Sequence, residues 1–273
     1  MRPASLISLV LLFGCDDGLK VPREVLGVQY GTDAAQVLDL YLPPDPTPDA
    51  PLVILIHGGA WAFGSRDDEY PQAFIAPLNE AGMVACPIDF RLADSIPEHQ
   101  MADIGAAMAE GLSQCARLGI GQSRVYVVGF SSGGHLALRY AYAGPGGGQV
   151  AGVVSVSGPT DLTAQDLRDR FAFHGFLWGL EQFVGGTYDS IPDAYLAASP
   201  VAVATGTPTL LLHGTADDIV PYSQALALND TLVAMGFPPT FITFEGAGHD
   251  LLSADQATGT LMIQGVVEWI RSH

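Results

Sequence analysis

The hydrophobic positions of the chain follow two alternating patterns. Short runs of continuous apolar residues recur along the sequence, and longer segments with helical spacing lie between them. Continuous apolarity is typical of parallel strands that are buried on both faces. The alternation therefore predicts an α/β fold with a mostly parallel central sheet flanked by helices. The expected parallel strands are residues 52–56, 84–88, 125–128, 150–156 and 209–212, and the expected helices are 71–81, 98–118, 132–143, 222–235 and 256–272.

The segments before the first parallel strand have a different pattern. Residues 25–31 and 36–42 alternate between apolar and polar positions, which predicts two antiparallel strands joined by a polar turn. A proline-rich connector, residues 43–51, then leads into the parallel part of the sheet. We therefore expect a single α/β domain over residues 25–273.

Residues 163–199 interrupt the alternation of strands and helices. The large apolar residues of this segment include Phe171, Phe173, Phe176, Leu177, Trp178 and Phe183. Aromatic side chains at this density would be unfavourable in a bare surface loop. A cap over a pocket and ordinary helical packing on the sheet both fit the pattern, and we expect a small partial cap.

Composition and charge restrict the class of protein. Of the 273 residues, 48% are hydrophobic and only 15% are charged, which indicates a sizeable core rather than a disordered chain. The chain has 11 Lys and Arg residues against 29 Asp and Glu residues, a net charge of −18. Because such a surface repels phosphate backbones, we expect no nucleic-acid partner.

The N-terminus has the pattern of an export signal. Arg2 precedes an apolar run, residues 6–13, which is shorter than the roughly 20 residues of a membrane-spanning helix. The string Leu-Phe-Gly-Cys that ends at Cys15 resembles a bacterial lipobox, in which the cysteine is lipidated. We expect a signal peptide at 1–14 and a tether at 15–24, and hence an exported protein that contacts the membrane only through this lipid. An ordinary secretory signal, with a secreted or periplasmic product, is the alternative.

The two remaining cysteines, Cys86 and Cys115, fall on a predicted strand and near the end of the following helix. A disulfide and a pair of buried free thiols both fit this placement, and free thiols are favoured. Neither cysteine has a histidine beside it in a catalytic context, so we expect no thiol nucleophile.

The clearest chemical motif follows the predicted strand at 125–128. Gly129-Phe130-Ser131-Ser132-Gly133 is a Gly-x-Ser-x-Gly sequence between a strand and a helix, where a sharp turn forces the serine into a strained conformation. The flanking glycines have no side chains to obstruct that turn. We therefore expect Ser131 to be a nucleophile. Ser132 is the alternative, but it lacks the flanking pair of glycines at the corresponding positions.

A serine nucleophile needs a base and an acid that orients the base. His249 lies in a glycine-containing loop before the last predicted helix, and Asp217 follows the strand at 209–212. The order Ser, Asp, His is the order of this motif's fold. Asp218 is the alternative acid, because only one of two adjacent carboxylates can face His249. We expect His213, at the end of the same strand, to be a hydrogen-bonded structural residue.

The reaction also needs donors for an oxyanion. Residues 57–61, His-Gly-Gly-Ala-Trp, follow the strand at 52–56 and form the expected oxyanion loop. The predicted donors are the N–H groups of Gly59, Ala60 and Ser132. We expect His57 to orient this loop. The predicted pocket residues are Trp61, Phe130 and Trp178.

These motifs together resemble the α/β-hydrolase superfamily from Val25 onward. The His-Gly-Gly-x-Trp loop is similar to that of its lipase and esterase group, and several further segments resemble the xylan acetyl- and feruloyl-esterase-like branch (BD-FAE-like). These segments are residues 38–43, 89–92, 183–186, 198–200 and 213–221. The resemblance implies an α/β-hydrolase fold and hydrolysis of a carboxylic ester through an acyl-enzyme on Ser131. It implies no cofactor, and His57, His213 and Asp217 lack the spacing of metal ligands.

The expected substrates are short-chain or aryl esters, as small molecules or linked to a saccharide. Kynurenine formamidases share the same loop and catalytic residues, so an amidase or formamidase is the nearest alternative. A non-catalytic, tethered binding protein is a more distant one, because no member of the Ser131, His249 and Asp217 set is missing.

Overall fold

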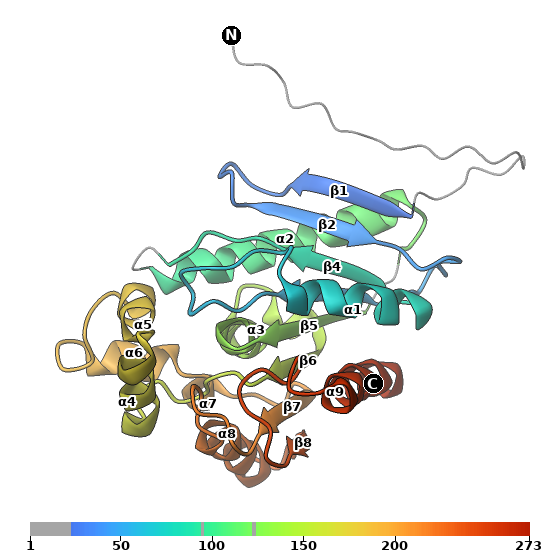
Figure 1. The fold of residues 1–273 in the computed structure, drawn as a ribbon. Coiled ribbons are helices and arrows are strands. Elements are labelled where there is room, and N and C mark those ends of the chain that lie inside the picture. Colours follow the sequence, from blue (N-terminus) through green and yellow to red (C-terminus); the bar gives the residue numbers. More distant parts are fainter. Residues whose placement is uncertain (1–22, 94–95, 122–123) are drawn as a thin grey trace, which may run out of the picture.

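The computed structural model describes residues 23–93, 96–121 and 124–273 (Figure 1). The predicted signal peptide and Cys15 lie outside the described residues and stay predictions. The first strand begins at Glu24, so the segment expected as a tether, residues 15–24, already includes the start of the sheet.

An eight-stranded sheet forms the centre of the molecule, in the order β1-β2-β4-β3-β5-β6-β7-β8. β2 runs antiparallel to both of its neighbours, β1 and β4, and the six strands from β3 to β8 are parallel to one another. The predicted mostly parallel sheet is confirmed. The strands are β1 (Glu24–Gln29), β2 (Val37–Tyr41), β3 (Leu52–Ile56), β4 (Val84–Ile88), β5 (Val125–Phe130), β6 (Val150–Val156), β7 (Thr209–Gly214) and β8 (Thr240–Phe244).

Helices cover both faces of this sheet (Figure 1). α1 (Glu69–Glu80) and α9 (Gln256–Ser272) pack on one face, and α2 (Pro97–Arg117), α3 (Ser132–Ala143) and α8 (Ser223–Ala234) pack on the other. A short 3-10 turn, Gly147–Gln149, precedes β6. Successive side chains of a strand point to opposite faces, so a strand that is buried on both faces must be apolar at nearly every position. The fully buried strand Leu52–Ile56 meets this requirement.

The segment that interrupted the sequence pattern, residues 163–199, folds into three short helices: α4 (Gln165–His174), α5 (Leu177–Val184) and α6 (Pro192–Ala198). A fourth, α7 (Pro200–Val203), follows directly. In Figure 1, α4, α5 and α6 lie together at the end of the sheet toward which β4 points. α5 packs tightly on the oxyanion loop, since a Cβ atom at Gly179 would lie 2.5 Å from the carbonyl oxygen of Ala60. These helices form the predicted small partial cap.

Cys86 and Cys115 are free thiols in the core, as the favoured alternative predicted. Burial raises the pKa of the Cys115 thiol to about 11 and that of Cys86 well above its ordinary value. Both groups therefore stay protonated near neutral pH and are poor nucleophiles.

Candidate active site

Ser131 lies in a sharp turn between β5, which ends at Phe130, and α3, which begins at Ser132. Its φ of 53° is in the left-handed region, which non-glycine residues rarely adopt. The turn needs its two glycines. A Cβ atom at Gly129 would lie 2.0 Å from the carbonyl oxygen of Gly133, and one at Gly133 would lie 2.3 Å from that of His57.

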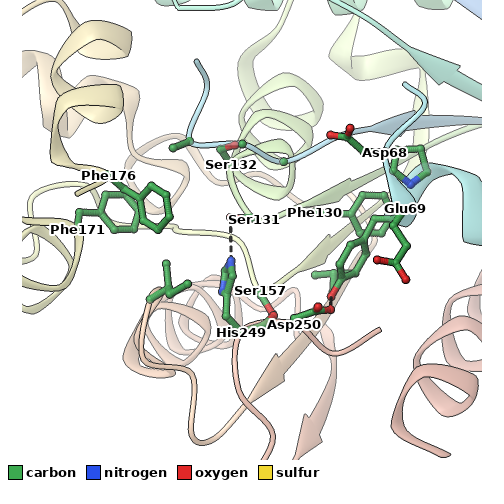
Figure 2. A pocket seen from close by; sticks show the side chains of 17 residues that line it. Asp68, Glu69, Phe130, Ser131, Ser132, Ser157, Phe171, Phe176, His249 and Asp250 are labelled. Carbon is green, nitrogen blue, oxygen red and sulfur yellow. Dashed lines mark hydrogen bonds between the residues drawn. The ribbon is translucent and has the colours of Figure 1, made fainter. Parts of the chain in front are cut away.

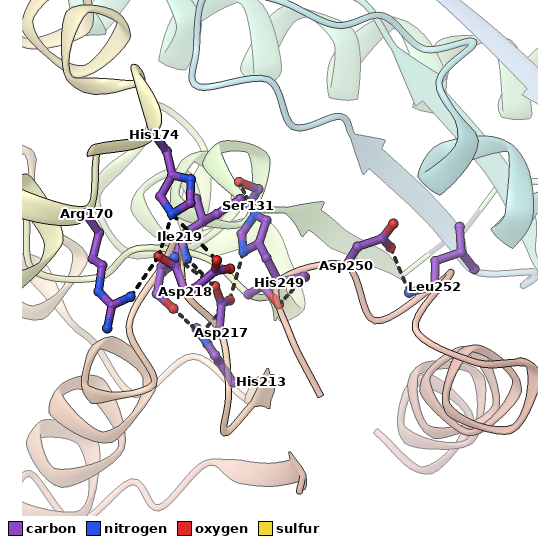
Figure 3. Close-up of polar contacts among 12 residues, drawn as sticks. Ser131, Arg170, His174, His213, Asp217, Asp218, Ile219, His249, Asp250 and Leu252 are labelled. Atoms are coloured by element: carbon purple, nitrogen blue, oxygen red, sulfur yellow. Dashed lines mark hydrogen bonds and ion pairs between the residues drawn. The ribbon is translucent and has the colours of Figure 1, made fainter. Parts of the chain in front are cut away.

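The structure brings Ser131, His249 and Asp217 together from three separate segments. The hydroxyl of Ser131 lies 3.0 Å from Nε2 of His249 (Figure 2). On the other side of the ring, Nδ1–H of His249 donates to Oδ2 of Asp217 at 2.8 Å (Figure 3). With this tautomer, Nε2 is left to accept the proton of Ser131, which is the arrangement that a general base requires.

The Asp217 carboxylate is buried and held from several directions. Its Oδ1 atom accepts hydrogen bonds from the backbone N–H groups of Ile219 and Val220, at 3.0 and 2.9 Å. Nε2 of His213 lies 3.2 Å from Oδ2 and also donates to the carbonyl of Val220. Burial alone would raise the pKa of Asp217, but the hydrogen bonds from His213 and His249 outweigh it and lower the pKa well below the ordinary range. Asp217 is therefore ionised and oriented.

Asp218, the alternative acid, points elsewhere. Its carboxylate lies 3.7 Å from Nε2 of His174 in α4, and its side chain is 62% exposed. Its carbonyl oxygen accepts hydrogen bonds from His174 and Arg170 (Figure 3). The structure therefore places Asp217, and not Asp218, against His249.

Two residues that the sequence did not single out support the His249 loop. The Ser157 hydroxyl donates to the backbone carbonyl of His249 at 3.2 Å. The Tyr70 hydroxyl in α1 donates to Asp250 at 2.8 Å and accepts from the N–H of Leu252 at 3.1 Å. Ser157 also has a positive φ of 51°, but no short sequence motif marks it.

The oxyanion loop has an unusual backbone. Gly59, Ala60 and Trp61 have positive φ angles of 110°, 48° and 61°. Among the described residues, no backbone acceptor pairs with the N–H groups of Gly59 and Ala60. Both residues line the same cavity as Ser131 and Ser132. The predicted oxyanion donors thus lie beside the nucleophile, where an additional oxygen atom would find unpaired N–H groups.

The cavity around Ser131 has a volume of about 390 Å³. Figure 2 shows Phe171 and Phe176 of the cap on one side of His249, and Phe130, Asp68 and Glu69 on the other. The apolar side of the cavity thus comes mainly from the cap, and the acidic side from the segment that opens α1.

Two of the three predicted pocket residues are wrong. Phe130 lines the cavity, whereas Trp61 and Trp178 do not. Trp61 is 1% exposed because its ring turns into the core and stacks on Phe183, with centroids 5.1 Å apart. Trp178 is 54% exposed on the outside of α5, next to Phe63.

Nδ1–H of His57, the residue expected to orient the oxyanion loop, donates to the carbonyl of its neighbour Gly58 at 2.7 Å. Within residues 23–93, 96–121 and 124–273, no group of three or more His, Cys, Asp or Glu side chains is placed to hold a metal ion. The helices in this part of the chain are all too short or too polar to cross a membrane.

The chain is similar to several hydrolases. Esterase LipC of Mycobacterium tuberculosis (strain ATCC 25618 / H37Rv) is 32% identical over 246 residues, which cover 82% of this chain and 60% of LipC. The kynurenine formamidase of Danio rerio is 32% identical over 126 residues, which cover 45% of this chain and 41% of that protein. The aligned part of this chain thus spans 60% or less of the length of these two relatives.

Solved structures show the same fold. A truncated form of a carbohydrate esterase from gut microbiota superposes with a TM-score of 0.74 at 24% identity, covering 91% of this chain and 96% of that one. The α/β-hydrolase fold predicted from the sequence is confirmed. Residues 38–232 match the profile of the BD-FAE family. The chain therefore belongs to the BD-FAE family.

Proposed function

We propose that this protein hydrolyses carboxylic esters through a serine acyl-enzyme. The observation that carries the proposal is the hydrogen-bonded series Ser131, His249 and Asp217, which opens into a cavity beside two unpaired backbone N–H groups. The similarity to esterase LipC supports the same reaction class.

In the acylation step, Oγ of Ser131 attacks the carbonyl carbon of the ester while its proton passes to Nε2 of His249. The negative charge that forms on the carbonyl oxygen is stabilised by the N–H groups of Gly59, Ala60 and Ser132. Asp217 stabilises the imidazolium and keeps its Nδ1–H in place. When the tetrahedral intermediate collapses, the alcohol leaves with the proton of His249.

Deacylation repeats these steps with water. His249 accepts a proton from the water molecule that attacks the acyl carbon, and the same N–H groups stabilise the second oxyanion. The carboxylic acid leaves and Ser131 recovers its proton from His249. The low pKa of Asp217 keeps its carboxylate ionised through both steps. This matters because a protonated Asp217 would accept the hydrogen bond of His249 less well and would no longer orient the ring.

The substrates that we propose are short-chain or aryl esters, free or linked to a saccharide, and the size of the cavity supports the short acyl group. Its volume of about 390 Å³ is near the lower end of the roughly 300–1,000 Å³ of ligand pockets. Phe171 and the half-buried Phe176 border the apolar side and limit the length of an acyl chain.

The first test compares the wild-type protein with Ser131→Ala on 4-nitrophenyl acetate, butyrate and laurate, a feruloyl ester and formylkynurenine. The proposal predicts that esters are turned over fastest and that the variant loses nearly all turnover. Faster turnover of formylkynurenine would favour a formamidase, which the relative from Danio rerio makes the second candidate. Equal rates in both proteins, or none in either, would favour a non-catalytic binding protein.

The acyl preference has its own test. We expect Phe176→Ala to raise the rate on laurate relative to acetate about tenfold, because the truncation opens the apolar side of the cavity. Phe173→Ala is the matched control, since Phe173 is 84% exposed and does not line the cavity. An unchanged ratio in Phe176→Ala, or faster wild-type turnover of laurate than of acetate, would contradict the short-chain preference.

We also propose that the protein is exported and anchored through a lipid on Cys15, on the basis of the sequence pattern at 6–15. Expression in a bacterium with labelled palmitate should label the wild-type protein but not Cys15→Ala. A processed, unlabelled wild-type protein would instead indicate an ordinary secretory signal.

A further inference from the structure

A buried hydrogen-bond chain connects the oxyanion loop to the helix after the nucleophile and to the cap. The indole N–H of Trp61 donates to Nδ1 of His135 in α3, at 3.1 Å. Nε2–H of the same histidine donates to the carbonyl oxygen of Ala198, the last residue of α6, at 2.9 Å. His135 lies one helical turn after Ser131, and its backbone N–H donates to the Ser131 carbonyl at 3.2 Å. Three elements around the cavity thus meet at one imidazole ring.

The partners of His135 fix its protonation. A backbone carbonyl only accepts hydrogen bonds and an indole N–H only donates them. The ring must therefore carry its proton on Nε2 and leave Nδ1 unprotonated. The side chain is completely buried, and burial lowers the pKa of His135 to about 3. The hydrogen bond to Ala198 opposes this shift, and the nearby charge of Arg139 adds to it. The imidazole is neutral at the pH of the reaction, so it serves as a fixed connector and not as a base.

The loop needs such a connector because its backbone is strained. Ala60 and Trp61 both have positive φ angles, which are unfavourable for residues with a Cβ atom and persist only where the surroundings impose them. The Trp61 side chain is the anchor. It is 1% exposed and stacks on Phe183, and its indole N–H has His135 as its partner. The backbone carbonyl of Trp61 is held separately, by the N–H of Ala93 at 2.9 Å.

We propose that His135 and Trp61 are positioning residues for the oxyanion hole. By fixing the indole, His135 holds the backbone of residues 59–61 in the conformation that presents the N–H groups of Gly59 and Ala60 to the cavity. Through Ala198 the same ring ties that loop to the cap. Neither side chain lines the cavity, so their effect on substrate passes through the loop. This inference rests on the proposed ester hydrolysis and adds residues to it.

A role in oxyanion stabilisation predicts a specific kinetic signature. The N–H groups act on the charge of the transition state more than on the neutral ester, so their displacement lowers kcat and leaves KM nearly unchanged. We expect Trp61→Phe, which keeps an aromatic ring of smaller size and removes the donor, to lower kcat on 4-nitrophenyl acetate about tenfold, with KM within about twofold. His135→Leu should have the same effect.

The double variant and a conservative one test the connection itself. If Trp61 and His135 act through one hydrogen bond, the variant with both substitutions should lose no more activity than His135→Leu alone. His135→Gln, which offers an acceptor and a donor in one side chain, should recover part of the lost kcat. A trifluoromethyl ketone, which forms a tetrahedral oxyanion on Ser131, should bind more weakly to Trp61→Phe by the same factor as the loss in kcat.

Tyr142→Phe is the matched control. It removes another buried hydrogen bond of α3, from Tyr142 to Thr209 at 2.8 Å, far along the helix from the loop. It should lower the melting temperature without lowering kcat. If His135→Leu does not fold, Trp61→Phe and the ketone affinities still decide the question.

The inference is overturned if folded Trp61→Phe and His135→Leu retain kcat within about twofold, if their losses add in the double variant, or if Tyr142→Phe loses kcat equally. These failures are distinct from failure of the proposed function. If Ser131→Ala is inactive while the Trp61 and His135 variants are fully active, only the positioning role is wrong. If Ser131→Ala is as active as the wild type, the proposed function itself is wrong.

Discussion

The two parts of the proposed catalytic site, the acid–base pair and the oxyanion loop, are held in place by different means. Asp217 and His249 bond directly to each other, and Asp217 also accepts two backbone N–H groups of its own loop. The oxyanion loop instead combines a strained backbone with one buried side chain, Trp61, whose polar partner lies on another element.

This difference indicates how each part responds to substitution. In the acid–base pair, the groups that position the chemistry are the groups that perform it, so short-range changes have the largest effects. In the oxyanion loop, the proposed donors are backbone N–H groups, which only a substitution by proline deletes. They are displaced only by changes in φ or in the packing of Trp61.

The largest expected effect is on the acid–base pair. Asp217→Asn should lower kcat about 10⁴-fold, because an amide no longer holds His249 in the tautomer that accepts the Ser131 proton. Asp218→Asn is the matched control, since its carboxylate faces His174 and solvent, and it should retain kcat within about twofold. Steady-state kinetics on 4-nitrophenyl acetate checks both. Similar losses in the two variants would mean that the assignment of the acid is wrong.

A smaller effect is expected from the oxyanion loop. Gly59→Ala should lower kcat about 10²-fold, because Gly59 has a φ of 110° and a Cβ atom there would lie 2.3 Å from the carbonyl oxygen of Phe63. Gly82→Ala tests backbone strain alone, since Gly82 has a φ of 83° and open space around it. Both variants should melt at lower temperature, but only Gly59→Ala should lose turnover. Full activity of Gly59→Ala would show that the loop tolerates displacement.

The smallest expected effect concerns stability and pH. The pKa of His135 is about 3 in the folded protein against an ordinary value of 6.5, so between these values the unfolded chain binds more protons. This histidine therefore lowers the free energy of unfolding as the pH falls from about 6.5 toward 3. His135→Gln has no histidine at this position and loses no stability in this way. The difference in free energy of unfolding between the wild type and His135→Gln should therefore become smaller when the pH is lowered from about 7 to about 5.

Urea unfolding of both proteins at the two pH values measures that difference. The lowered pKa of Asp217 does not interfere, because its contribution is lost only as the pH falls below its ordinary value of 3.8. A stability difference that is independent of pH would contradict a buried, neutral His135.

Most of the fold could be predicted from the sequence because each strand and helix has a recognisable pattern of apolar positions within its own segment. Each strand buried on both faces is a continuous apolar run, and the helices between them keep their spacing. The positions of Ser131, His249 and Asp217 followed from motif order, since the carboxyl ends of parallel strands meet at one edge of the sheet. Their mutual hydrogen bonds show that this ordering also describes the geometry.

The pocket wall was harder to predict because it depends on contacts between distant segments. An aromatic residue in a motif, such as Trp61, looks the same in a sequence whether it turns toward the cavity or into the core, and here a positive φ and Phe183 turn it inward. The sequence shows that His135 lies four residues after Ser131. Its hydrogen-bond partner Trp61, however, lies 74 residues away in the oxyanion loop. Helical periodicity alone could not connect the two.

The strand order also has a consequence for how activity appears during folding. Ser131 follows β5, a central strand, whereas Asp217 and His249 follow β7 and β8, the last two strands in the chain and in the sheet. During synthesis from the N-terminus, the nucleophile turn is complete before its base exists. A nascent chain therefore contains Ser131 before it contains the segments that carry Asp217 and His249. If the proposed ester hydrolysis is correct, it cannot begin until β7, β8 and the loops that follow them have joined the sheet.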